Sequence, residues 1–289
     1  MPEISLKDML KAGAHFGHQT QRWNPKMKPY IFEARNGVHI INLKLTVDMC
    51  KKAVEAVRDV VANGDSVLFV GTKLQAQEVV KEAARQSEMF FVSNRWLGGF
   101  LTNFRTIKSS METYNELDRQ SQEGGYQTRT KKEALLLDKK RQRMAKNFAG
   151  IAKMHRLPGI IFVVDPVKDR LAVDEANRLD IPVVALADTN CDPDPIQYPI
   201  PANDDAMRSI KLFTDMIAEA AMEGKGLYDA RIQESAQAIA ASSDDSKGPT
   251  GVRVKKARLG KRDERRQASE AYAEPEQEPA HLDDEPGQE

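Results

Sequence analysis

The sequence predicts an α/β fold, in which a parallel β-sheet is covered by helices on both faces. Short apolar stretches bounded by turn residues, such as residues 160–164 and 183–187, are typical of strands buried on both faces. Stretches with helical spacing alternate with them, as in sheets built from strand, helix and strand units. The 289 residues, 40% of them hydrophobic, suffice to bury such a core.

The N-terminal part is predicted to hold a short helix, an arm and a strand. Ser5 is a suitable capping residue for a helix that ends near Gly13. Residues 14–28 show no periodicity, and we expect a loop or arm there. Residues 38–43 follow Asn36-Gly37 and are rich in β-branched side chains, which predicts a strand.

The remaining elements of the sheet domain follow in alternation, which gives about five strands in all. The pattern predicts strands at 66–70, 89–92, 160–164 and 182–186, and helices at 46–62, from 74 to about 86, 167–179 and 204–222.

An insertion separates two of these strands. Some 67 residues lie between 89–92 and 160–164, far more than a strand-to-helix connection needs. Both halves of the insertion repeat apolar residues every three or four positions, and Gly124-Gly125 supplies a turn. We therefore expect an antiparallel coiled-coil helical hairpin over 104–156. Arg141 interrupts the apolar seam, and we expect it near the tip or pointing outward.

This alternation predicts three parts of the chain. Residues 1–103 and 157–226 form the globular domain with its N-terminal arm, and residues 104–156 form the hairpin. Residues 227–289 read as a largely disordered charged tail, with room for one helix at 227–241.

The net charge of zero conceals a segregation of charge along the chain. Residues 1–44 carry 7 basic and 3 acidic groups, and residues 95–158 carry 14 and 6. Residues 159–226 carry 6 basic and 13 acidic groups. If the two basic stretches converge in the fold, they form a surface for a polyanion. The alternative is a set of solvated faces.

Several classes of protein are disfavoured. The apolar runs are far shorter than the roughly 20 residues that span a bilayer, so no membrane segment is expected. The first residues lack a secretory signal, and we expect the protein to stay in the compartment where it is made. Cys50 and Cys191 form neither a disulfide framework nor a zinc spacing.

An enzyme of the same fold class is the alternative function. Gly71-Thr72-Lys73 follows a strand and could hold the phosphate of a nucleotide or sugar phosphate, but it lacks both phosphate-loop spacings. Asp165, Asp188 and Asn190 follow strands where catalytic groups would lie, although polar residues there also cap helices.

A metal site is only weakly indicated. His15 and His18 could bind a metal with His39 or Cys50 as a third ligand, but they lie three residues apart in an aperiodic segment. We expect neither a metal nor a cofactor.

Nucleic acid is the partner that the basic stretches favour. In residues 22–35 cations alternate with aromatic residues, which pairs phosphate binding with surfaces for base stacking. The alternative is an arm whose aromatic residues are pinned onto the sheet. The candidate RNA-binding residues are Arg22, Trp23, Lys26 and Lys28 in the arm, Arg95, Arg105 and Lys108 at the root of the hairpin, and Arg129, Lys131, Lys132, Lys139 and Arg143 on its second helix.

Five segments carry a family resemblance. Residues 12–18 (AGAHFGH), 22–27 (RWNPKM), 95–99 (RWLGG), 101–104 (LTNF) and 158–190 occur in the order of the bacterial small ribosomal subunit protein 2 family. The chain resembles that family over about residues 4–226, and the tail is not covered.

The resemblance implies a flavodoxin-like (Rossmann-like) sheet with a coiled-coil hairpin. It implies a non-enzymatic ribosomal protein of the cytoplasm, placed between head and body of the small subunit and bound to small-subunit rRNA. It also implies that neighbouring ribosomal proteins are partners, including the large mRNA-binding ribosomal protein 1. A third possibility is that the hairpin docks a protein and touches RNA only incidentally.

Overall fold

The computed structural model describes residues 5–123 and 130–244, with side chains up to residue 235. The chain divides into two compact units, residues 1–238 and residues 239–289, and the description below concerns the first. The tail predicted for 245–289 lies outside the described residues.

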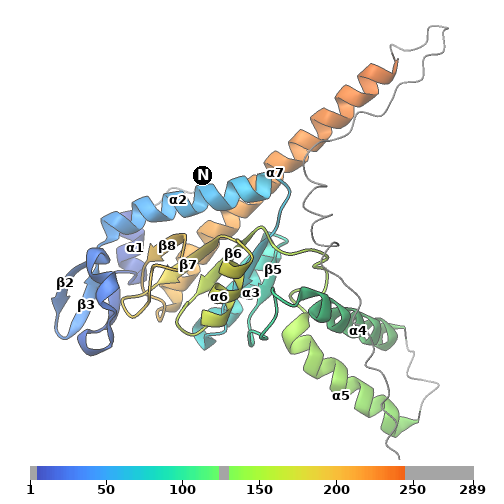
Figure 1. The fold of residues 1–289 in the computed structure, drawn as a ribbon, viewed down its shortest axis with the longest axis horizontal. Coiled ribbons are helices and arrows are strands. Elements are labelled where there is room, and N and C mark those ends of the chain that lie inside the picture. The colour runs from blue at the N-terminus through green and yellow to red at the C-terminus, as the bar shows by residue number, and fades with distance from the viewer. Residues whose placement is uncertain (1–4, 124–129, 245–289) are drawn as a thin grey trace, which may run out of the picture. The chain divides into compact units, whose positions relative to one another are not determined.

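The main sheet has five parallel strands in the order β5-β4-β6-β7-β8 (Figure 1). The strands are β4 (Val67–Val70), β5 (Phe90–Val92), β6 (Ile160–Val164), β7 (Val183–Ala187) and β8 (Tyr198–Pro201). Every residue of β4, β6 and β7 is buried, as continuously apolar strands predict. The α/β class and the parallel, flavodoxin-like sheet are confirmed.

Two hydrophobic clusters cover the two faces of this sheet. Side chains alternate between them along each strand, so that Phe69 belongs to one cluster and Leu68 to the other. The first cluster involves α1 (Leu6–Ala12), α2 (Leu43–Ala62), α3 (Leu74–Gln86) and α7 (Met207–Asp244). The second involves α6 (Arg170–Arg178), the arm and the base of the hairpin. The arm and the hairpin therefore share one face of the sheet.

A second, antiparallel sheet of three strands was not predicted. β1 (Phe16–Gln19), β3 (Val38–Ile41) and β2 (Ile31–Arg35) pair in that order. The strand predicted at 38–43 therefore exists but belongs to this sheet, and residues 14–28 contain β1 and the short 3-10 helices η1 (Thr20–Arg22) and η2 (Pro25–Tyr30). Asn36 and Gly37, both with positive φ, form the tight turn between β2 and β3.

The fifth strand of the main sheet is β8, which the sequence analysis missed. It contains Pro199 and Pro201, and proline disfavours a strand because it cannot donate a ladder hydrogen bond. At the edge of the sheet only one side of a strand is paired, so both prolines are tolerated.

Two helices occupy the insertion, α4 (Phe104–Gln122) and α5 (Lys131–Phe148). α4 buries Ile107, Met111, Tyr114 and Leu117 at the predicted spacing. α5 has 18 residues, which corresponds to a length of about 27 Å. Their packing as a coiled coil stays a prediction.

Arg141 differs from its expected position. Instead of pointing outward it is half-buried, and its guanidinium lies 3.1 Å from the Asp118 carboxylate of α4. The same guanidinium lies 2.9 Å from Asp138 on its own helix. A cation is therefore tolerated in the apolar seam because two carboxylates neutralise it.

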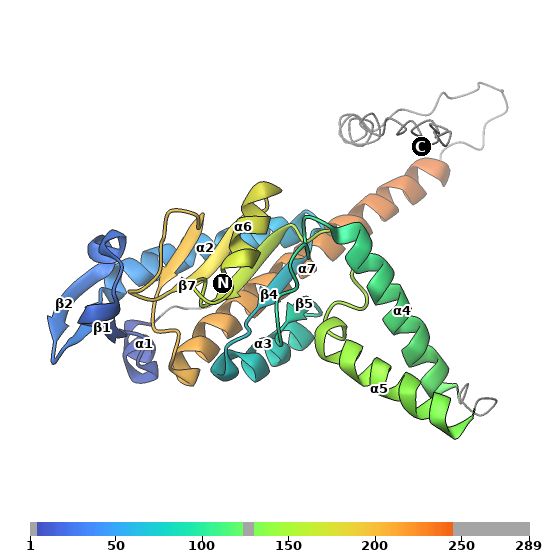
Figure 2. The ribbon, with the colours of Figure 1, turned by 60° about the horizontal axis from the view of Figure 1, so that its bottom comes forward.

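The last helix is longer than predicted. We expected this helix to end at about residue 222, but α7 continues through Gly224. A Cβ at this glycine would lie 2.5 Å from the carbonyl oxygen of Arg58 and 2.9 Å from Val61 on α2. The glycine is therefore required where α7 comes close to the last turns of α2, which it passes at an angle (Figure 1, Figure 2). Among the described helices, none combines the length and apolarity that a bilayer crossing demands.

Candidate nucleic-acid interface

The arm is fixed to the main sheet by its backbone and one apolar side chain. The amide of Asn24 donates to the carbonyl of Thr189, just after β7, at 2.8 Å. Met27 is fully buried in the cluster that also holds Leu68. The Asn24 side chain accepts from the Lys26 amide at 3.0 Å and caps η2. The arm is thus a defined structure, and its backbone is not free to follow an RNA.

The four candidate residues of the arm differ in availability. Arg22 and Lys28 are exposed and have no ion pair among the described residues. Lys26 lies 2.7 Å from Asp192 and 2.5 Å from Asp194, and the hydrogen bonds to these carboxylates raise its pKa. Trp23 is half-buried with its ring centroid 5.1 Å from that of His39. Trp23 is therefore partly packed against the protein, as the alternative of a pinned arm predicts, and partly exposed.

The root of the hairpin is organised by one carboxylate, that of Glu175 on α6. Its Oε1 accepts from Trp96 Nε1 at 3.1 Å and from the Gly99 amide at 2.8 Å. Its Oε2 accepts from the amides of Leu101 and Thr102 at 2.9 and 3.1 Å, and from the Thr102 hydroxyl at 3.2 Å. Burial alone would raise the pKa of Glu175, but these donors outweigh it and lower the pKa. Glu175 therefore holds the loop that carries Arg95 and leads to Arg105 at the start of α4.

Sequence reasoning did not assign Glu175 any role. A signal was present, since Glu175 lies among Ala172, Val173 and Ala176 on the face of α6 that is buried in the core. A charged residue on an apolar helix face must have partners, because an unpaired buried charge is costly.

The basic residues of the root and of α5 are largely available. Arg95 and Arg105 are exposed, and Lys108 is half-buried. No ion pair involves them in the described parts of the chain. The same holds for the four α5 candidates that are described, Lys131, Lys132, Lys139 and Arg143, which are all exposed. Arg129 lies outside the described residues.

α6 lies between the arm and the root. On the arm side, Asn24 shares a cleft of 740 Å³ with Arg170 and Asp174 of α6. On the root side, Arg95 shares a cleft of 540 Å³ with Lys168. The arm and the root thus flank one helix on one face of the sheet, and Lys168 and Arg170, which sequence reasoning missed, carry positive charge between them.

At the carboxyl edge of the main sheet, acidic side chains form ion pairs with a lysine of the protein itself. Lys73 Nζ lies 2.7 Å from Asp204, 2.5 Å from Asp205 and 3.5 Å from Asp165. Burial opposes the charge of Lys73, but the hydrogen bonds to Asp204 and Asp205 raise its pKa. Because three carboxylates already surround this ammonium group, the nucleotide site considered at Gly71-Thr72-Lys73 is electrostatically unsuited to a phosphate.

One group of side chains at this edge has the geometry to hold a cation. His18, Asp188 and Asp204 each offer a ligand atom, and these atoms all lie within 4.8 Å of one another. His18 Nδ1 is 3.1 Å from Asp188, whose hydrogen bond raises the His18 pKa. The other residues considered for a metal site, His15, His39 and Cys50, are not part of this group. Both cysteines are buried and free.

The comparisons with known proteins agree with these features. The family model described as "Ribosomal protein S2" matches residues 9–224. A small ribosomal subunit protein uS2 from Geotalea uraniireducens (strain Rf4) is 52% identical over 233 residues, which are 81% of this chain and 91% of the relative. A protein of the same name from Desulfatibacillum aliphaticivorans is 56% identical over 225 residues, covering 78% of this chain and 76% of the relative. With the match covering the sheet, the hairpin and the Glu175 loop, the chain belongs to the ribosomal protein S2 family.

Proposed function

We propose that this protein binds small-subunit rRNA between the head and body of the small ribosomal subunit and helps to dock ribosomal protein 1. As a family member it is a structural, non-enzymatic ribosomal protein of the small subunit and works in translation on the cytoplasmic ribosome of bacteria. The proposal adds the RNA-binding surface and the protein partner.

The observation that carries the RNA-binding surface is the unequal availability of charge. Arg95, Arg105 and the four described α5 candidates, Lys131, Lys132, Lys139 and Arg143, are exposed without ion pairs among the described residues. Buried carboxylates such as Asp188, Asp204 and Glu175, in contrast, bond to groups of the protein itself. The root of the hairpin and α5 therefore present unpaired positive charge, although the net charge of the chain is zero. Phosphate-rich, folded RNA is the partner that such a surface attracts.

A different observation supports protein docking on the hairpin. Leu135 and Leu136, in the first half of α5, are each 58% exposed. Adjacent exposed leucines on a helix are suited to an apolar contact with another protein. RNA would be bound by the cations and ribosomal protein 1 by the apolar side chains of the same helix.

The RNA-binding surface is tested by charge reversal. We expect Arg95→Glu with Arg105→Glu to reduce co-sedimentation with small subunits strongly, because both cations are unpaired. Lys26→Glu should have a smaller effect, since Asp192 and Asp194 already neutralise Lys26. The matched control is Arg119→Glu, at an exposed hairpin residue paired with Glu116 and Glu123. Unchanged sedimentation of the Arg95 and Arg105 variant would reject these positions.

The docking role is tested by shortening the hairpin between Tyr114 and Arg141. We expect the shortened protein to remain attached to rRNA through its root while ribosomal protein 1 is lost from the particle. Loss of rRNA attachment with ribosomal protein 1 retained would contradict the proposal.

A further inference from the structure

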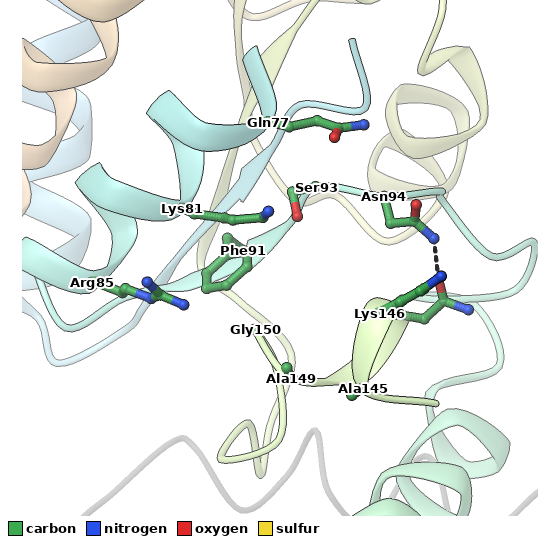
Figure 3. A pocket seen from close by; sticks show the side chains of 11 residues that line it. Gln77, Lys81, Arg85, Phe91, Ser93, Asn94, Ala145, Lys146, Ala149 and Gly150 are labelled. Atoms are coloured by element: carbon green, nitrogen blue, oxygen red, sulfur yellow. Dashed lines mark hydrogen bonds between the residues drawn. The ribbon is translucent and has the colours of Figure 1, made fainter. Parts of the chain in front are cut away.

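A pocket of 460 Å³ lies between α3, the end of β5 and the end of α5 (Figure 3). We call it the α3–α5 pocket. Its volume falls within the roughly 300–1,000 Å³ that is usual for sites of small ligands. The lining residues come from α3 (Gln77, Lys81, Arg85), from β5 and the residues after it (Phe91, Ser93, Asn94), and from the end of α5 and the residues after it (Ala145, Lys146, Asn147, Ala149, Gly150).

Three cations border this pocket. Figure 3 shows Lys81 and Arg85 extending from α3 on one side, and Lys146 on the α5 side with its ammonium group turned toward Asn94. Lys81 lies 2.6 Å from Glu78, a largely exposed carboxylate, while Arg85 and Lys146 have no ion pair among the described residues. The charged part of a ligand that suits these side chains is an anion.

The pocket also offers an aromatic surface. Phe91 is half-buried, and its ring lies between Arg85 and Lys146 in the view of Figure 3. A Cβ at Gly150 would lie 2.6 Å from the ring, so the backbone packs closely against the ring there. An anion with a planar ring, rather than a bare anion, uses both the cations and the aromatic surface.

Unused polar groups complete the lining. Ser93 is only 6% exposed, and its side chain makes no hydrogen bond to the described residues. The Asn94 side chain donates to Asn147 at 2.8 Å and ties the residues after β5 to α5. The walls are thus held in place, and the Ser93 hydroxyl remains available to a ligand.

We propose that the α3–α5 pocket binds one unpaired nucleotide of an RNA strand, with its base against Phe91 and its phosphate between Arg85 and Lys146. This inference rests on the proposed function and adds a defined subsite to it. A strand is favoured over a free nucleotide because Lys146 follows Lys139 and Arg143 by seven and three residues, on one face of α5. This row of cations leads the phosphates of a neighbouring strand to the pocket.

The test is an NMR titration of the full-length protein with adenosine 5′-monophosphate, adenosine and inorganic phosphate. We expect the monophosphate to shift the amides of Ser93, Asn94 and Gly150 saturably, and adenosine and phosphate to bind at least tenfold more weakly. Arg85→Gln with Lys146→Gln should weaken the monophosphate at least tenfold. Phe91→Leu should weaken it about tenfold and leave the affinity for phosphate unchanged. The matched control is Lys51→Gln with Lys52→Gln, at exposed residues of α2.

Three results would overturn the inference. They are the absence of saturable shifts, equal affinity for phosphate and the monophosphate, and an equal loss in the α2 control variant. A single-stranded adenosine heptamer should bind more tightly than the monophosphate, and the reverse order would assign the pocket to free nucleotides instead of RNA.

The subsite and the proposed function can fail separately. If the pocket variant loses the monophosphate but the wild-type protein does not co-sediment with small subunits, the proposed function fails and the nucleotide pocket remains. If the wild-type protein co-sediments but binds no nucleotide, only the subsite is refuted.

Discussion

The carboxyl edge of the main sheet and the second helix of the hairpin use charge in opposite ways. At the edge, Lys73 is surrounded by Asp165, Asp204 and Asp205, and little of its charge reaches a partner. On α5, exposed cations such as Lys139 and Arg143 have no ion pair in the described structure. A basic residue in the sequence therefore indicates a binding surface only if the structure shows that it has no acidic partner within the protein.

We expect the largest effect when the cation at the carboxyl edge of the main sheet is removed. Lys73→Met leaves buried carboxylates without a counter-charge, and we expect the free energy of unfolding to fall by about 3 kcal/mol. Urea unfolding at neutral pH measures this loss. The control is Lys81→Met on α3, because Glu78, the partner of Lys81, is exposed. Equal effects of the two variants would show that the edge is not held by its ion pairs.

A second prediction concerns the carboxylate that organises the hairpin root. All the groups that face the Glu175 carboxylate are hydrogen-bond donors, so the amide NH2 of Glu175→Gln would have no acceptor there. We expect the free energy of unfolding to fall by about 2 kcal/mol. We also expect weaker co-sedimentation with small subunits, because Arg95 and Arg105 lose their support. Asp174→Asn, at the exposed neighbour, is the control. If the Glu175→Gln variant is as stable as the wild type and co-sediments normally, the loop before α4 does not depend on the Glu175 carboxylate.

A third prediction tests whether the unpaired cations of α5 bind RNA. We expect Lys131→Gln, Lys132→Gln, Lys139→Gln and Arg143→Gln together to lower the affinity for an rRNA fragment about 10- to 100-fold near 0.15 M salt. The log–log salt dependence of binding should become less steep by up to about three, while urea unfolding stays unchanged. A loss of affinity without a change in the salt slope would argue against phosphate contacts.

The smallest effect is a pH dependence at Glu175. Because the pKa of this carboxyl is lower in the folded protein than its ordinary value of about 4.3, its ionisation favours the folded state. That contribution is complete above the ordinary pKa and is lost as the pH falls through the folded pKa. The stability difference between wild type and Glu175→Gln should therefore shrink as the pH falls below the ordinary pKa of a glutamate. A constant difference would contradict this account.

Much of the sheet could be predicted because its strands are buried on both faces. The continuous apolar stretches of β4, β6 and β7 are easily recognised in the sequence. β8 was missed because it contains Pro199 and Pro201, and proline argues against a strand except at the edge of a sheet. The N-terminal sheet was missed because its strands β1 and β2 are short and mostly exposed. The last helix was predicted too short, and the role of Gly224 within it is explained only by its contact with α2.

The candidate site was predicted by residue type but not by availability. Arg95, Arg105 and the described α5 candidates are exposed as binding requires, while the acidic partners of Lys26 are some 170 positions away in the chain and could not be foreseen. Lys168 and Arg170 were overlooked because they belong to the acidic half of the sequence. Long-range pairing is set by the fold, which a count of charges along the chain does not contain.

The tie between Glu175 and the loop before the hairpin also has a consequence for biosynthesis. The donors of the loop leave the translating machinery 73 to 79 residues ahead of the carboxylate that receives them. Since nascent chains emerge from the N-terminus onward, α4 and α5 are complete while their base is still unanchored. The rod can take its final direction only after the second half of the sheet domain has been made, so a truncated chain cannot aim it at its target.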